Sequence, residues 1–138
     1  MIVIACVDND MGMLFNRRRQ SQDSRVREKI LRLCAGRKLW MNAYSFRQFE
    51  PFAAELGENI LVAEDFLVRA GDTDYCLVEN VDASAYVDKI EQVVLYRWNR
   101  DYPADFYFTV PLSGWRMLYR EDFSGTSHEK ITEEVYGR

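Results

Sequence analysis

Histidine, cysteine and proline are all scarce in this sequence, and the first two shortages limit its chemistry. The chain has one histidine, His128, so it cannot assemble the histidine-rich cluster of a zinc hydrolase. Its three cysteines, Cys6, Cys34 and Cys76, are widely spaced and form no paired-cysteine motif. We therefore interpret them as reduced, buried, small apolar residues of a cytoplasmic protein, and we expect no metal centre.

Long apolar runs and nucleotide-binding glycine motifs are also missing. No run approaches the length that crosses a bilayer, and Met1–Val7 is too short for a signal peptide, so we expect no membrane partner. The seven glycines form neither a Walker loop nor a glycine-rich dinucleotide fingerprint. No nucleophile elbow occurs either.

The composition is that of an acidic globular protein. A formal net charge of −4 and a pI near 5.1 disfavour a general nucleic-acid binder. Hydrophobic residues make up 48% of the chain and aromatic residues 14%, which predicts a packed core. With 138 residues, the chain is long enough to form one domain, 1–138.

Short apolar runs alternate with amphipathic segments over the first two thirds of the chain. Ile2–Val7 is continuously apolar and rich in β-branched residues, which is typical of a central strand buried on both faces. Ser24–Cys34 has the spacing of an amphipathic helix. The alternation predicts an α/β fold with a mostly parallel central sheet and flanking helices. Further strands are expected at 39–41, 60–63, 74–79 and 93–98, helices through Phe46 and Phe49 and at 64–70 and 83–90, and a turn at 51–56.

The last third of the chain predicts antiparallel strands. An aromatic run, Phe106–Val110, precedes Pro111, and Trp115–Phe123 alternates in the manner of a half-buried strand. A turn at 125–127 can lead back to a last short strand, Lys130–Tyr136. We expect these segments to end the sheet as a C-terminal antiparallel hairpin.

The same C-terminal segment resembles the end of dihydrofolate reductases. The order is an acidic residue, aromatics, proline-leucine, tryptophan, Arg-Glu, Phe-Ser-Gly and a closing Glu-Val-Tyr, over residues 105–136. The N-terminal string from Val3 to Met13 resembles the first strand and mobile loop of that family. The resemblance implies a dihydrofolate reductase-like fold, with a pocket between Asp8, Gly12, Met13, Asp23 and Tyr96. Tyr96 is alternatively a core residue.

Asp23 is the nearest match to the family's carboxylate, which opens a helix and helps to protonate the pterin. The resemblance implies a catalytic role for it. The alternative is an N-cap, in which the carboxylate accepts backbone N–H bonds at the start of the helix. Three arginines, Arg17, Arg18 and Arg19, precede Asp23 in the sequence. We expect them either to bind an anionic ligand through their planar guanidinium groups or to form a solvated loop.

The family's cofactor motifs are replaced in this chain. Where the family has basic residues that grip the NADPH phosphates at a helix start, this chain has Asn42-Ala43-Tyr44-Ser45, with Ser45 expected as a cap. Where the family has two glycines that let the backbone approach the pyrophosphate, this chain has Glu79 and Asn80. The resemblance makes NADPH possible, but its motifs are missing.

These substitutions predict a degenerate dihydrofolate reductase-like protein without efficient NADPH-dependent turnover. It would bind a small, possibly anionic, ligand or a protein partner in the cytoplasm. The alternative is an NADPH-dependent reductase of dihydrofolate or a pterin-like substrate. A third hypothesis, RNA binding through Arg17–Arg19 and Phe15, is disfavoured by the acidic total charge.

Overall fold

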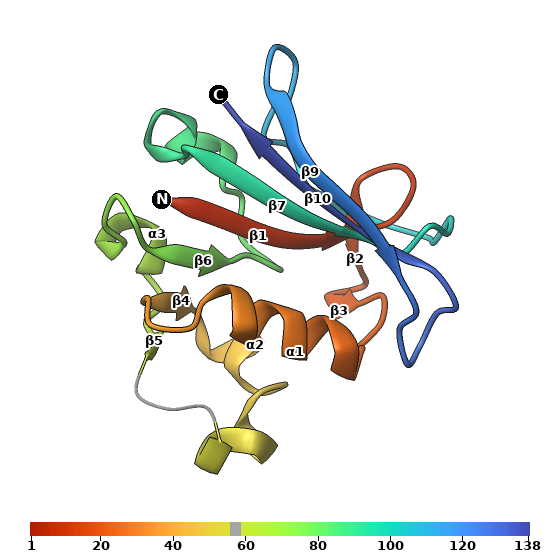
Figure 1. Cartoon of the computed structure of the whole chain (residues 1–138), viewed down its shortest axis with the longest axis horizontal. Coiled ribbons are helices and arrows are strands. Elements are labelled where there is room, and N and C mark those ends of the chain that lie inside the picture. Colours follow the sequence, from red (N-terminus) through yellow and green to blue (C-terminus); the bar gives the residue numbers. More distant parts are fainter. Residues whose placement is uncertain (56–58) are drawn as a thin grey trace.

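The computed structural model describes residues 1–55 and 59–138, and its largest feature is a seven-stranded sheet (Figure 1). The strand order is β5-β4-β6-β1-β7-β10-β9; neighbours from β5 to β7 are parallel, and the last two strands are antiparallel. This arrangement confirms the predicted α/β class. The strands are β1 (Ile2–Val7), β4 (Leu39–Met41), β5 (Ile60–Val62), β6 (Tyr75–Leu77), β7 (Gln92–Arg97), β9 (Arg116–Phe123) and β10 (Ile131–Gly137).

Strand β1 is the centre of the molecule, with β6 on one side and β7 on the other. Successive side chains of a strand point to opposite faces, and here both faces are covered. Val3 and Ala5 belong to one hydrophobic cluster, and Ile2 and Ile4 belong to a second. The prediction of a central strand is therefore confirmed.

Helix α1 (Ser24–Leu33) covers the Ile2 and Ile4 face, where it buries Val26 and Ile30. Its bounds agree with the predicted helix to within a residue. The helix has 10 residues, whereas a membrane span takes about 20. Among the described residues, no helix is both long and apolar enough to cross a bilayer.

The other helices are short, with four or six residues each. The predicted helix at 83–90 is a 3-10 helix, Ser84–Lys89, with a kink at Tyr86, whose φ of −111 and ψ of 18 are not helical. The turn predicted at 51–56 is a 3-10 helix in its described part, while Leu56 lies outside the described residues. The helices are α2 (Ala43–Phe46), η1 (Glu50–Glu55), α3 (Phe66–Arg69) and η2 (Ser84–Lys89).

A second, three-stranded sheet corrects one prediction. The aromatic run at Phe106–Val110 was expected in the C-terminal hairpin, but only Phe106–Tyr107 forms a strand, β8, and its partner is β2 (Gly12–Phe15). Backbone hydrogen bonds hold it there, from the Asp105 N–H to the Leu14 carbonyl and from the Phe108 N–H to the Met11 carbonyl. The third strand is β3 (Arg18–Arg19).

The C-terminal hairpin is formed by β9 and β10, and β10 also pairs with β7. The predicted hairpin is confirmed, but the half-buried pattern of its first strand is wrong. Every residue of β9 up to Asp122 is exposed, including Met117, Leu118 and Tyr119 at 47%, 52% and 45%. The strand is the outer edge of the sheet, and α1 reaches only its far end, where Lys29 meets Glu121.

Candidate functional site

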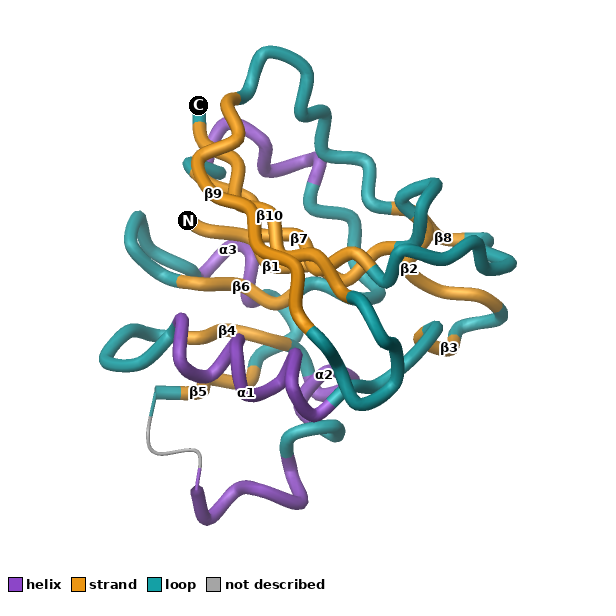
Figure 2. The backbone as a smooth tube through the Cα atoms, turned by 45° about the vertical axis from the view of Figure 1, so that its right-hand side comes forward, coloured by secondary structure: helices purple, strands orange, loops and turns teal. Residues whose placement is uncertain are grey.

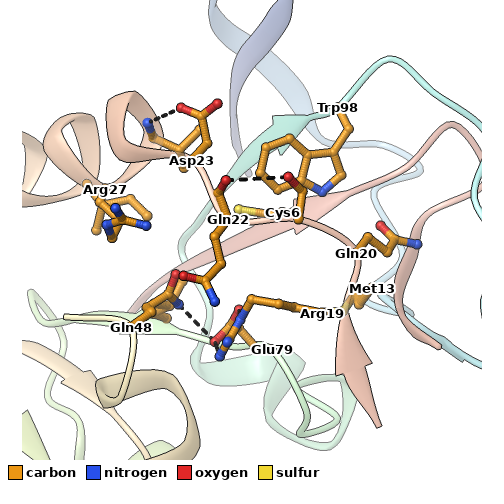
Figure 3. Close-up of a pocket in the computed structure, with 14 residues that line it drawn as sticks. Cys6, Met13, Arg19, Gln20, Gln22, Asp23, Arg27, Gln48, Glu79 and Trp98 are labelled. Carbon is orange, nitrogen blue, oxygen red and sulfur yellow. Dashed lines mark hydrogen bonds and ion pairs between the residues drawn. The ribbon is translucent and has the colours of Figure 1, made fainter. Parts of the chain in front are cut away.

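A small cavity lies between α1 and the carboxyl ends of the central strands, where open α/β sheets bind ligands (Figure 3). Its volume is about 20 Å³, which is room for roughly one water molecule. It is lined by Cys6, Met13, Arg19, Gln20, Ser21, Gln22, Asp23, Val26, Arg27, Ile30, Gln48, Leu77, Glu79 and Trp98.

Asp23 is the N-cap of α1 and also holds the β9–β10 loop. Its Oδ1 accepts hydrogen bonds from the backbone N–H groups of Arg25 at 2.9 Å and Val26 at 3.2 Å. Its Oδ2 accepts from the backbone N–H and the hydroxyl of Ser127, both at 2.7 Å. Burial raises the pKa of the Asp23 carboxyl, but these four hydrogen bonds outweigh it and hold the pKa below its usual value. The N-cap alternative is therefore confirmed.

The hydrogen bonds continue from Ser127 to His128 and Tyr102. Ser127 Oγ lies 2.6 Å from His128 Nδ1, and Tyr102 Oη lies 2.6 Å from His128 Nε2. Because the single Ser127 hydroxyl proton is donated to Asp23, Nδ1 must carry the imidazole proton and donate it to Ser127. Nε2 then accepts from Tyr102, so all three hydroxyl and imidazole protons point towards Asp23.

The imidazole of His128 is enclosed by aromatic rings. It stacks on Trp98 with ring centroids 4.9 Å apart and meets Tyr102 edge-on. Burial lowers the pKa of His128, the positive charge of Arg100 lowers it further, and Asp23 acts in the opposite direction. A neutral imidazole agrees with the hydrogen-bond directions.

Arg19 and Glu79, which both line the cavity, form an ion pair. Arg19 Nε and Nη2 donate to the two carboxylate oxygens at 3.0 and 3.1 Å, and Gln48 Nε2 donates to Oε1 at 3.0 Å. The Arg19 guanidinium also lies over the Tyr44 ring, 4.5 Å from its centroid. Burial lowers the pKa of Arg19, but Glu79 reverses this and raises it above its ordinary value. Arg19 and Glu79 therefore neutralise each other.

Asp8 organises the turn between β1 and β2. Its Oδ1 accepts from the backbone N–H groups of Gly12 at 2.7 Å and Asp10 at 2.9 Å, and its Oδ2 accepts from Gln20 Nε2 at 2.8 Å. A Cβ on Gly12 would lie 2.5 Å from Asp8 Oδ2 and 2.6 Å from the Cβ of Ala104. Glycine is needed there because the carboxylate approaches its backbone so closely. Neither Asp8 nor Gly12 is among the cavity-lining residues.

The other predicted ligand-binding residues separate into three places. Met13 lines the cavity, as does Arg19. Arg17 and Arg18 lie exposed at the turn between β2 and β3. Tyr96 is fully buried in the core, where its hydroxyl donates to Glu133 at 2.6 Å.

The start of α2 is occupied by the protein's own side chains. Asn42, not Ser45, is the N-cap, since its Oδ1 accepts from the Ser45 N–H at 3.0 Å; the expectation that Ser45 caps the helix is wrong. Asn42 Nδ2 donates to Asn80 Oδ1 at 2.7 Å. The Ala43 N–H donates to Glu64 Oε2 at 3.0 Å, which places a carboxylate where a helix start would otherwise accept an anion.

Sequence reasoning missed several residues of the cavity, chiefly Gln20, Gln48, Trp98 and Arg27. Arg27 could have been found, because it lies four residues after Asp23 and therefore on the same face of α1. Gln20 Oε1 is buried and has no hydrogen-bond partner among the described residues. No cluster of three or more His, Cys, Asp or Glu in residues 1–55 and 59–138 could hold a metal ion.

An open groove of about 280 Å³ adjoins the closed cavity and shares Arg19, Gln22, Arg27 and Gln48 with it. The groove adds Arg47, Pro51 and Phe52. Within the part of the chain that the structure describes, neither Arg27 nor Arg47 has an ion-pair partner. The Arg27 guanidinium lies 5.2 Å from the centroid of the Phe52 ring.

Comparison with solved structures identifies the architecture. No protein-family model matches the sequence, and no curated protein matches it. Dihydrofolate reductase from Enterococcus faecalis, solved in complex with NADP(H) and RAB-propyl, superimposes with a TM-score of 0.67 and 9% identity. The match covers 99% of this chain and 95% of that one. At this identity the likeness shows the fold alone, and the fold is that of dihydrofolate reductase.

Proposed function

We propose that this protein binds a small anionic ligand in the arginine-lined groove and does not turn over NADPH. The proposal rests on the observation that only one of the three arginines lining the groove has an ion-pair partner among the described residues. Arg19 is neutralised by Glu79, whereas Arg27 and Arg47 have no ion-pair partner in the described part of the chain. Two guanidinium groups that have no counter-charge among the described residues are suited to planar carboxylates or phosphates, which they can bind through paired hydrogen bonds.

The small size of the cavity supports binding at the groove rather than in the cavity. Ligand pockets for drug-sized molecules enclose about 300–1,000 Å³. The cavity beside Asp23 has a volume of about 20 Å³, and the Arg19–Glu79 ion pair borders it. A ligand would therefore contact Arg27, Arg47 and the ring of Phe52, with Gln22 and Gln48 as additional donors.

The chain's own carboxylates argue against a dinucleotide cofactor. The similar reductase from Enterococcus faecalis was solved with NADP(H), so the fold makes this cofactor the first to test. Here Glu64 occupies the first free N–H of α2, and Asn42 occupies the Ser45 N–H. Glu79 adds a second carboxylate at the end of β6. Glu64 would repel phosphate at the start of α2, and the Glu79 side chain, although neutralised by Arg19, stands where two glycines would let the backbone approach the cofactor, so the residues present do not fit NADPH.

A thermal-shift experiment with dihydrofolate, inorganic phosphate and NADPH tests the proposal. A ligand at 100 times its Kd stabilises the fold by about 2.7 kcal/mol. We expect an anionic ligand to raise the Tm of the wild type and of an Arg32→Gln control, because Arg32 lies exposed on α1 and outside the groove. The double variant Arg27→Gln/Arg47→Gln should lose the shift. An equal shift in all three proteins would refute binding at the groove.

An NADPH oxidation assay tests the alternative that the protein is a reductase. We expect no loss of absorbance at the nicotinamide band when the protein is mixed with NADPH and dihydrofolate. Steady oxidation that Asp23→Asn abolishes would contradict the proposal and favour a reductase in which Asp23 aids protonation. A Tm increase with NADPH that Glu64→Gln enlarges would also count against the proposal, since it would show that the cofactor binds at α2.

A further inference from the structure

Strand β9 is the free edge of the main sheet and carries an exposed apolar surface. It runs for eight residues beside β10, and no strand of the described chain pairs with its other side (Figure 2). The outward backbone groups of such an edge can accept another strand. Met117, Leu118 and Tyr119 are each about half exposed in the middle of β9, so the edge offers both backbone groups and apolar area.

The charges of β9 are divided between its two ends. Arg116 and Arg120 come first, and Glu121 and Asp122 follow. Two copies of the strand in antiparallel orientation would bring the basic end of one beside the acidic end of the other. Two parallel copies in register would instead place each charge beside its own kind, which is unfavourable. The strand is therefore complementary to itself in the antiparallel direction.

The same charges select one register. Backbone groups that point outward come from alternate residues of an edge strand, so two copies pair symmetrically about a residue rather than between two residues. An axis at Arg120 or at Glu121 would place that charge against its own copy. An axis at Leu118 would place Arg116 opposite Arg120 of the second copy. An axis at Met117 would bring no opposite charges together. An axis at Tyr119 avoids both clashes and places Arg116 opposite Asp122 of the second copy.

The local irregularity of β9 is compatible with the Tyr119 axis. Met117 and Tyr119 pair with consecutive residues of β10, so Leu118 is a bulged residue without a β10 partner. If Leu118 is counted in the register, Arg116 faces Asp122 of the second copy. If Leu118 is left out as the bulged residue, Arg116 faces Glu121. Tyr119 meets Tyr119 on the axis, so the two rings lie beside each other.

We propose that two copies of this protein dimerise by antiparallel pairing of their β9 strands about Tyr119, which joins their sheets into one. The partner is a second copy because the strand's charge order complements its own reverse. The groove that carries the proposed function lies at α1 and η1, so dimerisation leaves it open.

Cysteine cross-linking tests the register. A residue on the axis meets its own copy, so Tyr119→Cys should form a disulfide-linked dimer under mild oxidation. The native thiols do not interfere, because Cys34 and Cys76 are buried and burial raises the pKa of Cys6 well above its ordinary value. Ser113→Cys, exposed in the loop before β9, is the matched control and should remain a monomer. Equal cross-linking of both variants would overturn the proposed register.

Charge reversal tests the interface in the unmodified protein. Light scattering after size exclusion should show a dimer of the wild type at concentrations up to about 1 mM, where small interfaces are populated. Arg116→Asp should weaken it about tenfold, because two symmetry-related pairs change from attraction to repulsion. Glu121→Arg/Asp122→Arg should do the same, and the triple variant should restore the dimer. A monomeric wild type, or a dimer indifferent to Arg116→Asp, would refute the proposal; far-UV circular dichroism establishes that each variant is folded.

Discussion

At the scale of single residues, the turn between β2 and β3 has a backbone conformation that one of its side chains does not favour. The turn between β2 and β3 has two residues, Asn16 and Arg17, with φ of +51 and +63. Two-residue turns of this kind favour Asn-Gly, because only glycine takes the left-handed region without steric penalty. Asn16 satisfies the first position, and Arg17 does not satisfy the second.

We predict that Arg17→Gly stabilises the fold by about 1 kcal/mol, which is the typical steric penalty of one residue in the left-handed region. Urea unfolding should show a higher midpoint with an unchanged slope. Arg17→Ala is the control, because it removes the charge but keeps the steric conflict, and it should unfold near the wild-type midpoint. A stabilisation common to both variants would assign the effect to charge instead.

Asp23 holds both the start of α1 and the β9–β10 loop, so its substitution should destabilise both segments. Asp23→Asn retains the size of the side chain but loses the charge that the two Ser127 donors and the two α1 N–H groups share. We expect a loss of about 1–3 kcal/mol in the free energy of unfolding. In a double-mutant cycle with Ser127→Ala the two losses should not add, because the residues share hydrogen bonds. Additive losses would contradict a link between α1 and the hairpin.

The outcome at Asp23 illustrates what local sequence signals can predict. A carboxylate directly before an amphipathic run indicates an N-cap, and the structure has that cap. The bond from Ser127 to Asp23 joins residues 104 positions apart, so no local pattern carries it. The same holds for Arg19 and Glu79, which are 60 positions apart and neutralise each other where sequence reasoning proposed an anion-binding arginine.

At the scale of elements, the loop between β9 and β10 is attached to the protein through a buried imidazole. The pKa of His128 is lowered in the fold, so in the unfolded chain the imidazole binds a proton at higher pH than in the native state. The unfolded state therefore gains protons first as the pH falls, and stability is lost as the pH drops through the unfolded pKa of about 6.5.

We predict that the free energy of unfolding decreases between pH 7.5 and pH 5.5, by at most about 1.4 kcal/mol per pH unit for this one group. His128→Gln should be less stable at pH 7.5 and should lack this pH dependence. The Asp23 carboxyl, whose pKa is also lowered, contributes a separate loss only at more acidic pH, below its ordinary value near 3.8. Parallel pH profiles of the wild type and His128→Gln would show that another group titrates.

Element prediction succeeded where the burial of a segment is encoded by its own residues. The apolar run of β1 and the amphipathic spacing of α1 each indicate their position, and both were confirmed. The alternation of β9 suggested a buried face, but a strand at the edge of a sheet has no layer to bury it against. The prediction that Phe106–Tyr107 belongs to the C-terminal hairpin was also wrong, since its partner β2 lies over 90 residues earlier in the chain.

At the scale of the whole molecule, two hydrophobic clusters lie on opposite faces of one strand. Val3 and Ile4 are neighbours in β1 yet belong to different clusters. A change in either cluster therefore acts on a strand that both require. That 1–138 forms a single domain stays a prediction.

We predict one cooperative unfolding transition. Trp40 belongs to the first cluster and Trp98 to the second, so tryptophan fluorescence reports on both faces of the sheet. Fluorescence and far-UV circular dichroism should give coincident curves in urea. Ile4→Ala should shift both curves together, with a loss of about 2–5 kcal/mol. Two separate transitions would instead indicate that the clusters unfold independently.

The row of hydrogen bonds from Tyr102 through His128 and Ser127 to Asp23 runs in one direction, and this has a consequence for the chemistry of Asp23. Each dipole in the row presents its positive end to the carboxylate, so the row as a whole stabilises an anion at its terminus. A group that serves as a proton reservoir must instead spend part of its time in the neutral state. Protonation of Asp23 would give up this favourable arrangement, so near neutral pH the carboxylate stays a negative anchor between helix and hairpin.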